Sequence, residues 1–229
     1  MSALSASTRS PAVPLLREGD RMDRTEFERR YDAMPELKKA ELLDGVVYMG
    51  SPVSTLRHGM PHTLLLGWLA NYWVATPGTV PSDNGSVRID GKNMPQPDAL
   101  LMIEREGHSR LDTGGYVAGG PELVAEVAGG RTDAVLRAKK LTYRRAGIRE
   151  YILWHVKDRE VEWFSLGGTR YAKLRAGKDG IHRSLVFPGL WLDVAALVRF
   201  DGPEVMRVLG QGLASPEHAA FVESLCDKS

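Results

Sequence analysis

The sequence is poor in cysteine: Cys226 is the only one in 229 residues. A single cysteine excludes an internal disulfide and a zinc site built from several cysteines. An excess of charge of one sign is lacking as well, since 30 Lys and Arg residues face 29 Asp and Glu residues. With a formal net charge of +1, a polyanionic partner must be met by a local basic patch, because no global field attracts it.

Long apolar runs are also absent. The longest candidate, Thr63 to Val74, is interrupted by Gly67 and Asn71, so no membrane span is expected. The first 14 residues are small and polar and lack the apolar centre of a secretory signal. Together with the single cysteine, these features predict a cytoplasmic protein.

The composition is that of a globular protein, with 43% hydrophobic and 26% charged residues. The length is enough for one domain with a proper core and short appendages. We therefore expect a flexible N-terminal tail at residues 1–20, a folded domain at 21–200 and a C-terminal helical tail at 201–229.

Hydrophobic patterning and turn signals predict an alternation of helices and strands. Thr25 is a candidate N-cap for the first helix, and Asp44-Gly45 is predicted to form a hairpin turn. Residues 51–59 and 104–120 are predicted loops, and the second of these is expected to be an exposed excursion from the domain. The predicted helices are 25–31, 60–73, 134–146, 194–198 and one or two within 203–225. The predicted strands are 39–43, 46–49, 86–90, 98–103, 123–127, 150–156, 160–166, 171–174 and 180–187. Strand 123–127, helix 134–146 and strand 150–156 form a βαβ-like unit, which indicates neighbouring parallel strands in a mixed sheet.

Two carboxylates stand out because each belongs to an apolar segment. Asp98 begins the run Ala99-Leu100-Leu101-Met102, and Glu126 lies inside Leu123 to Val127. A buried acid needs a partner. Paired carboxylates suit a hard cation such as Mg²⁺, and Lys139 on the next helix can fold back over the same pocket. Such parts can hydrolyse a phosphodiester with the help of a metal.

The residues alone also allow simpler explanations. Asp98 can cap a turn after Pro97, and Glu126 can form a buried ion pair with Lys139 or Lys140. The local pattern of the hairpin favours a solvated face for Glu41.

Several ordered motifs narrow these alternatives. They are Glu41-Leu42-Leu43-Asp44-Gly45, Ser51-Pro52 with Arg57-His58, Gln96-Pro97-Asp98, Pro121 to Val127, Lys139 with Tyr143, Tyr143 to Tyr151, and Phe187 to Leu192. Over residues 25–195 the chain resembles the restriction-endonuclease-like group called the Uma-two family, within the PD-(D/E)xK nuclease superfamily. The resemblance implies an α/β (α+β) fold with a restriction-endonuclease-like core, in which a curved mixed β-sheet is flanked by helices and the acids lie on adjacent central strands.

The resemblance also implies a function and a site. The chain is expected to be a Mg²⁺-dependent DNA endonuclease, with Mn²⁺ as a substitute, that acts as a homodimer. Asp98 and Glu126 are expected to bind the metal with the carbonyl of Val127 as a third ligand. Lys139 and Glu41 complete the expected catalytic set. Substrate contacts are expected from Arg57, His58 and Tyr143, of which Tyr143 shares a helix face with Lys139.

Two departures from the family pattern support an alternative. Gly129-Gly130-Arg131 replaces a serine-rich loop, and Val135 stands where relatives carry an Asp four residues before the helical lysine. A catalytically impaired nucleic-acid-binding or assembly protein that keeps the fold is therefore the second hypothesis. A hydrolase acting on another phosphodiester or on a nucleotide is the third.

Overall fold

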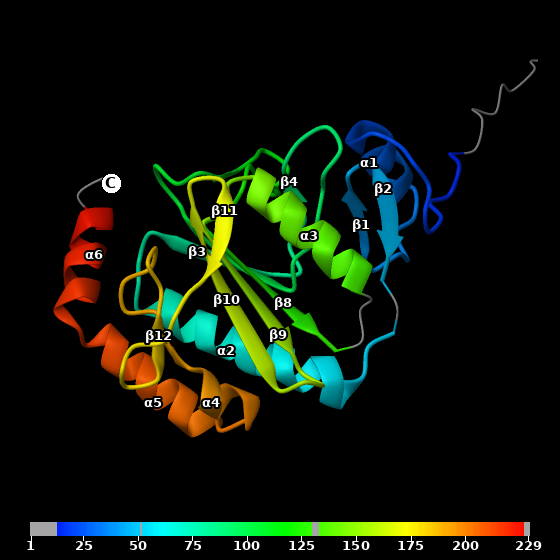
Figure 1. The fold of residues 1–229 in the computed structure, drawn as a ribbon. Helices are drawn as coiled ribbons and strands as arrows, with labels where there is room; N and C mark the ends of the chain where they lie inside the picture. The colour runs from blue at the N-terminus through cyan, green and yellow to red at the C-terminus, as the bar shows by residue number, and fades with distance from the viewer. Residues whose placement is uncertain (1–12, 51, 130–132, 227–229) are drawn as a thin grey trace, which may run out of the picture.

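A six-stranded mixed sheet forms the centre of the computed structural model, which describes residues 13–50, 52–129 and 133–226 (Figure 1). The strand order is β11-β10-β9-β8-β5-β3. The strands are β3 (Thr79–Asp83), β5 (Ala99–Ile103), β8 (Leu123–Ala128), β9 (Glu150–His155), β10 (Glu160–Gly167) and β11 (Arg170–Lys173). β8 and β9 pair in parallel and the other neighbours pair antiparallel. The predicted mixed sheet and its βαβ unit are confirmed.

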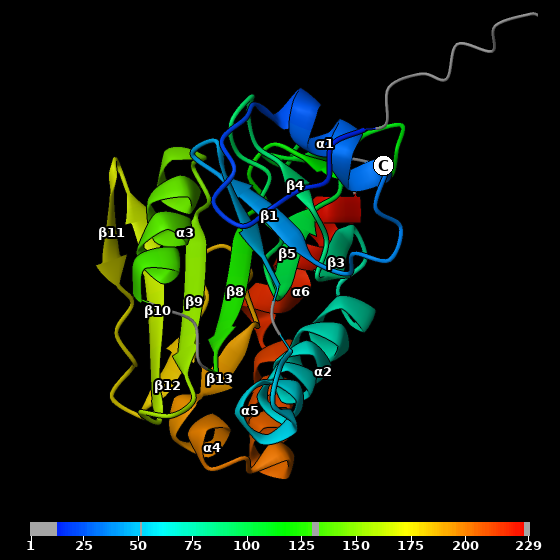
Figure 2. The same ribbon diagram turned by 90° about the vertical axis from the view of Figure 1, so that its right-hand side faces the viewer.

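Helices cover both faces of this sheet (Figure 2). Helix α3 (Asp133–Arg145) packs on one face, where Leu136 and Tyr143 meet Val124 of β8. Helices α2 (Met60–Val74) and α5 (Gly202–Leu213) pack on the opposite face with Ala125 and Val127. Successive residues of β8 thus enter two different cores, as the period of a strand requires. This explains why all six residues of β8 are buried.

A hairpin and a short helix lie beside the end of α3 (Figure 1). Strands β1 (Ala40–Leu43) and β2 (Val46–Met49) pair around Asp44-Gly45, as predicted, and both turn residues have positive φ. Helix α1 (Arg24–Asp32) is capped by Asp23, whose carboxylate accepts from the Glu26 N–H at 2.9 Å. The prediction that Thr25 is the cap was wrong, because the helix begins one residue before it.

The segment 104–120 is not the fully exposed excursion that we predicted. It contributes β6 (Arg110–Leu111) and β7 (Val117–Ala118) to a small sheet with β4 (Val87–Arg88), in the order β4-β7-β6. Val117 is buried in the same core as Val87. Many residues of the segment, both residues of β6 among them, are nevertheless exposed. The long-range pairing of β7 with β4 could not be predicted from local sequence.

The loop predicted before α2 also has structure where it is described. Thr55–Gly59 form one wide π-helical turn, η1, that runs directly into α2. Such turns are often found at functional sites.

The segment from residue 181 onward closes the face that α2 covers. A two-stranded sheet pairs β12 (Ile181–Arg183) with β13 (Trp191–Asp193), followed by α4 (Val194–Val198), α5 and α6 (Pro216–Cys226). The predicted strand 180–187 is shorter, because residues after Arg183 turn to hydrogen-bond with Glu150. Val205 and Leu209 of α5 are buried in the main core. The division into a tail, a domain and a second tail stays a prediction. None of the described helices could cross a membrane.

Candidate active site

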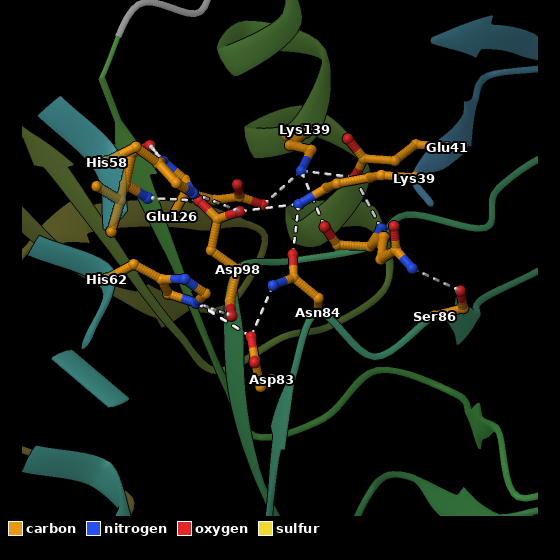
Figure 3. Close-up of polar contacts among 12 residues, drawn as sticks. Lys39, Glu41, His58, His62, Asp83, Asn84, Ser86, Asp98, Glu126 and Lys139 are labelled. Carbon is orange, nitrogen blue, oxygen red and sulfur yellow. Dashed lines mark hydrogen bonds and ion pairs between the residues drawn. The ribbon is translucent and has the colours of Figure 1, made fainter. Parts of the chain in front are cut away.

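Asp98 and Glu126 meet at the end of the β5–β8 ladder. The register pairs Ala99 with Ala125, so Asp98 and Glu126 occupy the next opposed positions of neighbouring antiparallel strands. Both residues are fully buried. Asp98 Oδ2 accepts a hydrogen bond of 2.9 Å from the Val127 N–H, next to Glu126 in the chain. The structure therefore brings the two predicted acids together (Figure 3).

Lys139 joins them from helix α3. Its Nζ lies 2.7 Å from Glu126 Oε1 and 2.6 Å from Glu41 Oε1, and it donates a long 3.4 Å bond to the Gln96 carbonyl. Lys139 is fully buried. The convergence of Lys139 on Glu126 is thus present, and it also has the geometry of the buried ion pair that the residues alone allowed. Lys140 points elsewhere, with its Nζ 3.3 Å from the ring centroid of Phe164.

Glu41 is part of this cluster. It is only 5% exposed, because all four residues of β1 are buried. Besides Lys139, its Oε1 accepts the Gln96 N–H at 2.7 Å. The solvated face that local patterning favoured for Glu41 was wrong, and the catalytic role that the resemblance implies for it stays a prediction.

Tyr143 supports Glu126. Its hydroxyl donates to Glu126 Oε1 at 2.6 Å, and the side chain is fully buried. Burial, followed by the charges of Glu126 and Glu41, raises the pKa of Tyr143 well above its ordinary value. Tyr143 is thus a neutral donor that orients an acid. The substrate contact expected of Tyr143 stays a prediction; in the structure its hydroxyl bonds to the acid.

Two histidines approach from η1 and α2. His58 Nδ1 lies 3.0 Å from the Val127 carbonyl oxygen, and His62 Nε2 lies 2.8 Å from the Asp98 carbonyl oxygen and 3.2 Å from Asp83 Oδ1. The π-helical turn carries His58 to the end of β8. Arg57, one residue earlier, is exposed.

Gly129 permits this approach. A Cβ at position 129 would collide with the backbone carbonyl of Arg57. The Gly129 N–H also donates to the Val127 carbonyl at 3.1 Å, so this oxygen already has two contacts. Loop residues 130–132 lie outside the described residues, and so does Thr132, which with Asp133 was one of two candidate N-caps for α3.

The sequence reasoning missed Lys39. Its Nζ lies 2.9 Å from Asp98 Oδ1 and 2.7 Å from Asn84 Oδ1, and its side chain is 20% exposed. Lys39 precedes Glu41 by two positions, so the two share one face of the strand. That spacing is a signal that could have identified it.

The donor set fits a hard divalent cation. Asp98 and Glu126 supply carboxylate oxygens at opposed positions, and Mg²⁺ binds through one or two carboxylates while it keeps several waters. Within residues 13–50, 52–129 and 133–226, no group of three or more His, Cys, Asp or Glu side chains has the arrangement of a metal site. The Val127 carbonyl, expected as a further ligand, is already an acceptor for Gly129 and a neighbour of His58.

The fold is similar to that of a protein of known structure. A crystal structure described as a putative nuclease belonging to DUF820 from Anabaena variabilis ATCC 29413 superimposes with a TM-score of 0.53 at 12% identity. The match covers 74% of this chain and 97% of that one, and at this identity it shows the fold alone.

The family follows from the sequence match. The Uma2 family, described as "Putative restriction endonuclease", matches residues 24–195. The chain belongs to this family, and the resemblance inferred from its ordered motifs is confirmed. No curated protein matches the chain.

Proposed function

We propose that this protein is a Mg²⁺-dependent endonuclease that hydrolyses phosphodiester bonds of DNA. The observation that supports this function best is the convergence of Asp98, Glu126 and Lys139 from two adjacent strands and the following helix. Membership of a family described as restriction endonucleases agrees with it.

In this proposal Asp98 and Glu126 hold the metal. A bound Mg²⁺, or Mn²⁺ in its place, would polarise the scissile phosphate and lower the pKa of a water molecule. Tyr143 and Lys139 fix the Glu126 carboxylate through the two contacts at its Oε1. Glu41 in turn holds Lys139.

Two lysines stabilise the charge that develops on the phosphate. Lys139 is fully buried, whereas the Lys39 side chain is 20% exposed. A phosphate that approaches from solvent therefore meets Lys39 first. His58 and the exposed Arg57 flank the same end of the sheet and are proposed substrate contacts. Because cutting a duplex requires hydrolysis of both strands, we propose a homodimer as the working form.

One set of observations favours the second candidate, a protein that keeps the fold and binds nucleic acid without cutting it. Both acids already contact lysines, the Val127 carbonyl has two neighbours, and Val135 replaces the usual Asp. The first two features oppose metal binding at the acids, and the third removes an acid one helical turn before Lys139.

Cleavage of supercoiled plasmid DNA in Mg²⁺ or Mn²⁺ distinguishes the two candidates. We expect nicked and then linear DNA from the wild type, and a loss of about 100-fold or more in Asp98→Asn and Glu126→Gln. Glu217→Gln, which changes an exposed acid on α6, should cut like the wild type. Equal nicking by all variants, or no cleavage by any of them in any divalent metal, would refute the nuclease. A mobility shift without cleavage would favour the second candidate.

A further inference from the structure

A cleft lies next to the acid cluster. It lies between α1, the end of β3 and the β7 region and has a volume of about 680 Å³, within the size range of ligand pockets. Its lining combines two aromatic rings with small polar groups. These are Tyr31, Tyr116, Ser82, Asn84, Ser86 and Gln96.

The chemistry of this lining indicates a neutral ligand. Asp32 is the one charged residue among the described residues that line the cleft, so an anion such as phosphate would find no cation there. Amide, hydroxyl and aromatic groups together suit a planar heterocycle with hydrogen-bonding edges.

Gln96 provides an independent sign of a ligand. The residue is only 9% exposed, and its Oε1 has no hydrogen-bond partner in the described structure. Its Nε2 makes a long 3.4 Å bond to Ser86 Oγ. Buried amide oxygens are normally paired. Gln96 Oε1 is therefore available to accept a hydrogen bond from an N–H group of a bound molecule. The side-chain amide offers an adjacent donor and acceptor, which is the pattern that the edges of nucleobases complement.

The cleft is connected to the acids by direct contacts. Asn84 lines the cleft and accepts from Lys39, which also contacts Asp98. The backbone N–H of Gln96 donates to Glu41. Figure 3 shows Asn84 and Ser86 on one side of Asp98, with His58 and His62 on the other. A group bound in the cleft thus lies next to a phosphate at Lys39.

We propose that this cleft is a nucleobase-binding subsite. The base of a nucleotide beside the scissile phosphate enters the cleft, its edge pairs with the Gln96 amide, and its ring contacts Tyr31 and Tyr116. The placement beside a scissile bond rests on the proposed nuclease function, whereas base binding itself does not require cleavage.

The test measures binding without cleavage. Asp98→Asn protein is titrated with a fluorescent single-stranded DNA of about 12 nucleotides, within the site sizes of single-strand binders. The comparison ligand is an oligonucleotide of equal length and charge in which every residue is abasic. We expect the intact strand to bind on the order of tenfold more tightly or better. Free deoxynucleotides serve as competitors and show whether a base alone suffices or a polynucleotide is needed.

Variants of the cleft provide the control. In the Asp98→Asn background, Gln96→Leu keeps the backbone contacts of residue 96 and should reduce the preference for the intact strand several-fold. Tyr31→Leu should reduce it through loss of the ring. Gln211→Leu, a matched change at an exposed position of α5, should leave it unchanged. Thermal unfolding of each variant shows whether it is folded.

The outcomes separate this subsite from the nuclease function. If plasmid is cut in a manner that requires Asp98 but intact and abasic strands bind equally, the subsite is refuted and the nuclease stands. If plasmid is never cut but the preference for bases exists and depends on Gln96, the subsite stands and the nuclease is refuted. A base preference that Gln96→Leu and Tyr31→Leu, both folded, leave unchanged also refutes the subsite.

Discussion

Replacing Lys139 by methionine tests the buried cluster most directly. The ammonium group lies 2.6 Å from Glu41 and 2.7 Å from Glu126, and the three residues are 0%, 5% and 0% exposed. Removing one partner of a buried ion pair costs about 3–5 kcal/mol, because the remaining charge stays in a poorly solvated place. Since Lys139 contacts two carboxylates, we expect a loss of about 4 kcal/mol in the free energy of unfolding.

Denaturant and thermal unfolding measure this loss. About 4 kcal/mol corresponds to a fall in Tm of roughly 8–16 °C for a chain of this size.

The neighbouring lysine is the control. Lys140→Met removes a partly exposed cation that lies over the Phe164 ring, and such a contact contributes about 0.5–1 kcal/mol. If Lys139→Met is destabilised no more than Lys140→Met, Lys139 is not the buried partner of the two acids and our account of the cluster fails.

Three further changes test the surroundings of the cluster. Tyr143→Phe removes a donor to a buried carboxylate and should lower the free energy of unfolding by about 1.5–3 kcal/mol in a denaturant titration. Because the pKa of Tyr143 is raised in the folded state, its contribution is complete below about pH 10 and is lost as the pH rises further; the Phe variant should lose less stability above that pH. Gly129→Ala should destabilise the protein by about 1–3 kcal/mol, because the new Cβ collides with the backbone of η1. The control Gly210→Ala lies in an open part of α5 and should stabilise the protein by about 0.5–1 kcal/mol. Equal effects of the two substitutions would contradict the close approach of Gly129 to η1. Lys39→Met should reduce plasmid cleavage about 100-fold while the circular dichroism spectrum stays native, and unchanged cleavage would exclude Lys39 from the site.

Local sequence determined most of the elements. Apolar residues at helical spacing predicted α2, and the turn residues Asp44-Gly45 predicted the hairpin; both are present. The strand–helix–strand order after Pro121 predicted parallel pairing of β8 and β9, because a crossover helix brings the second strand back in the same direction. Elements held by distant partners were missed. Strands β6 and β7 are short: β7 pairs with the distant β4, and β6 pairs with β7. Nothing in two-residue segments indicates such partners.

The candidate acids were likewise visible in the sequence, because a carboxylate inside an apolar strand demands a partner. Asp98, Glu126 and Lys139 could be named from that argument and the ordered motifs. Glu41 could not be placed by its own pattern, since the face of a hairpin that is buried depends on what packs against it. The sequence thus indicated that Asp98 and Glu126 would be buried and which helix carried Lys139, but not that Glu41 would join them.

Only the tertiary structure decided how those charges are paired. Lys39 forms an ion pair with Asp98, and Tyr143 donates a hydrogen bond to Glu126. Gln96 contacts the cluster through its backbone N–H and lines the neighbouring cleft. These contacts join residues 17 to 59 positions apart in the chain. Because ion pairs and hydrogen bonds depend on distances of a few ångströms, their partners are fixed by the packing of the sheet, the hairpin and α3, which no local pattern contains.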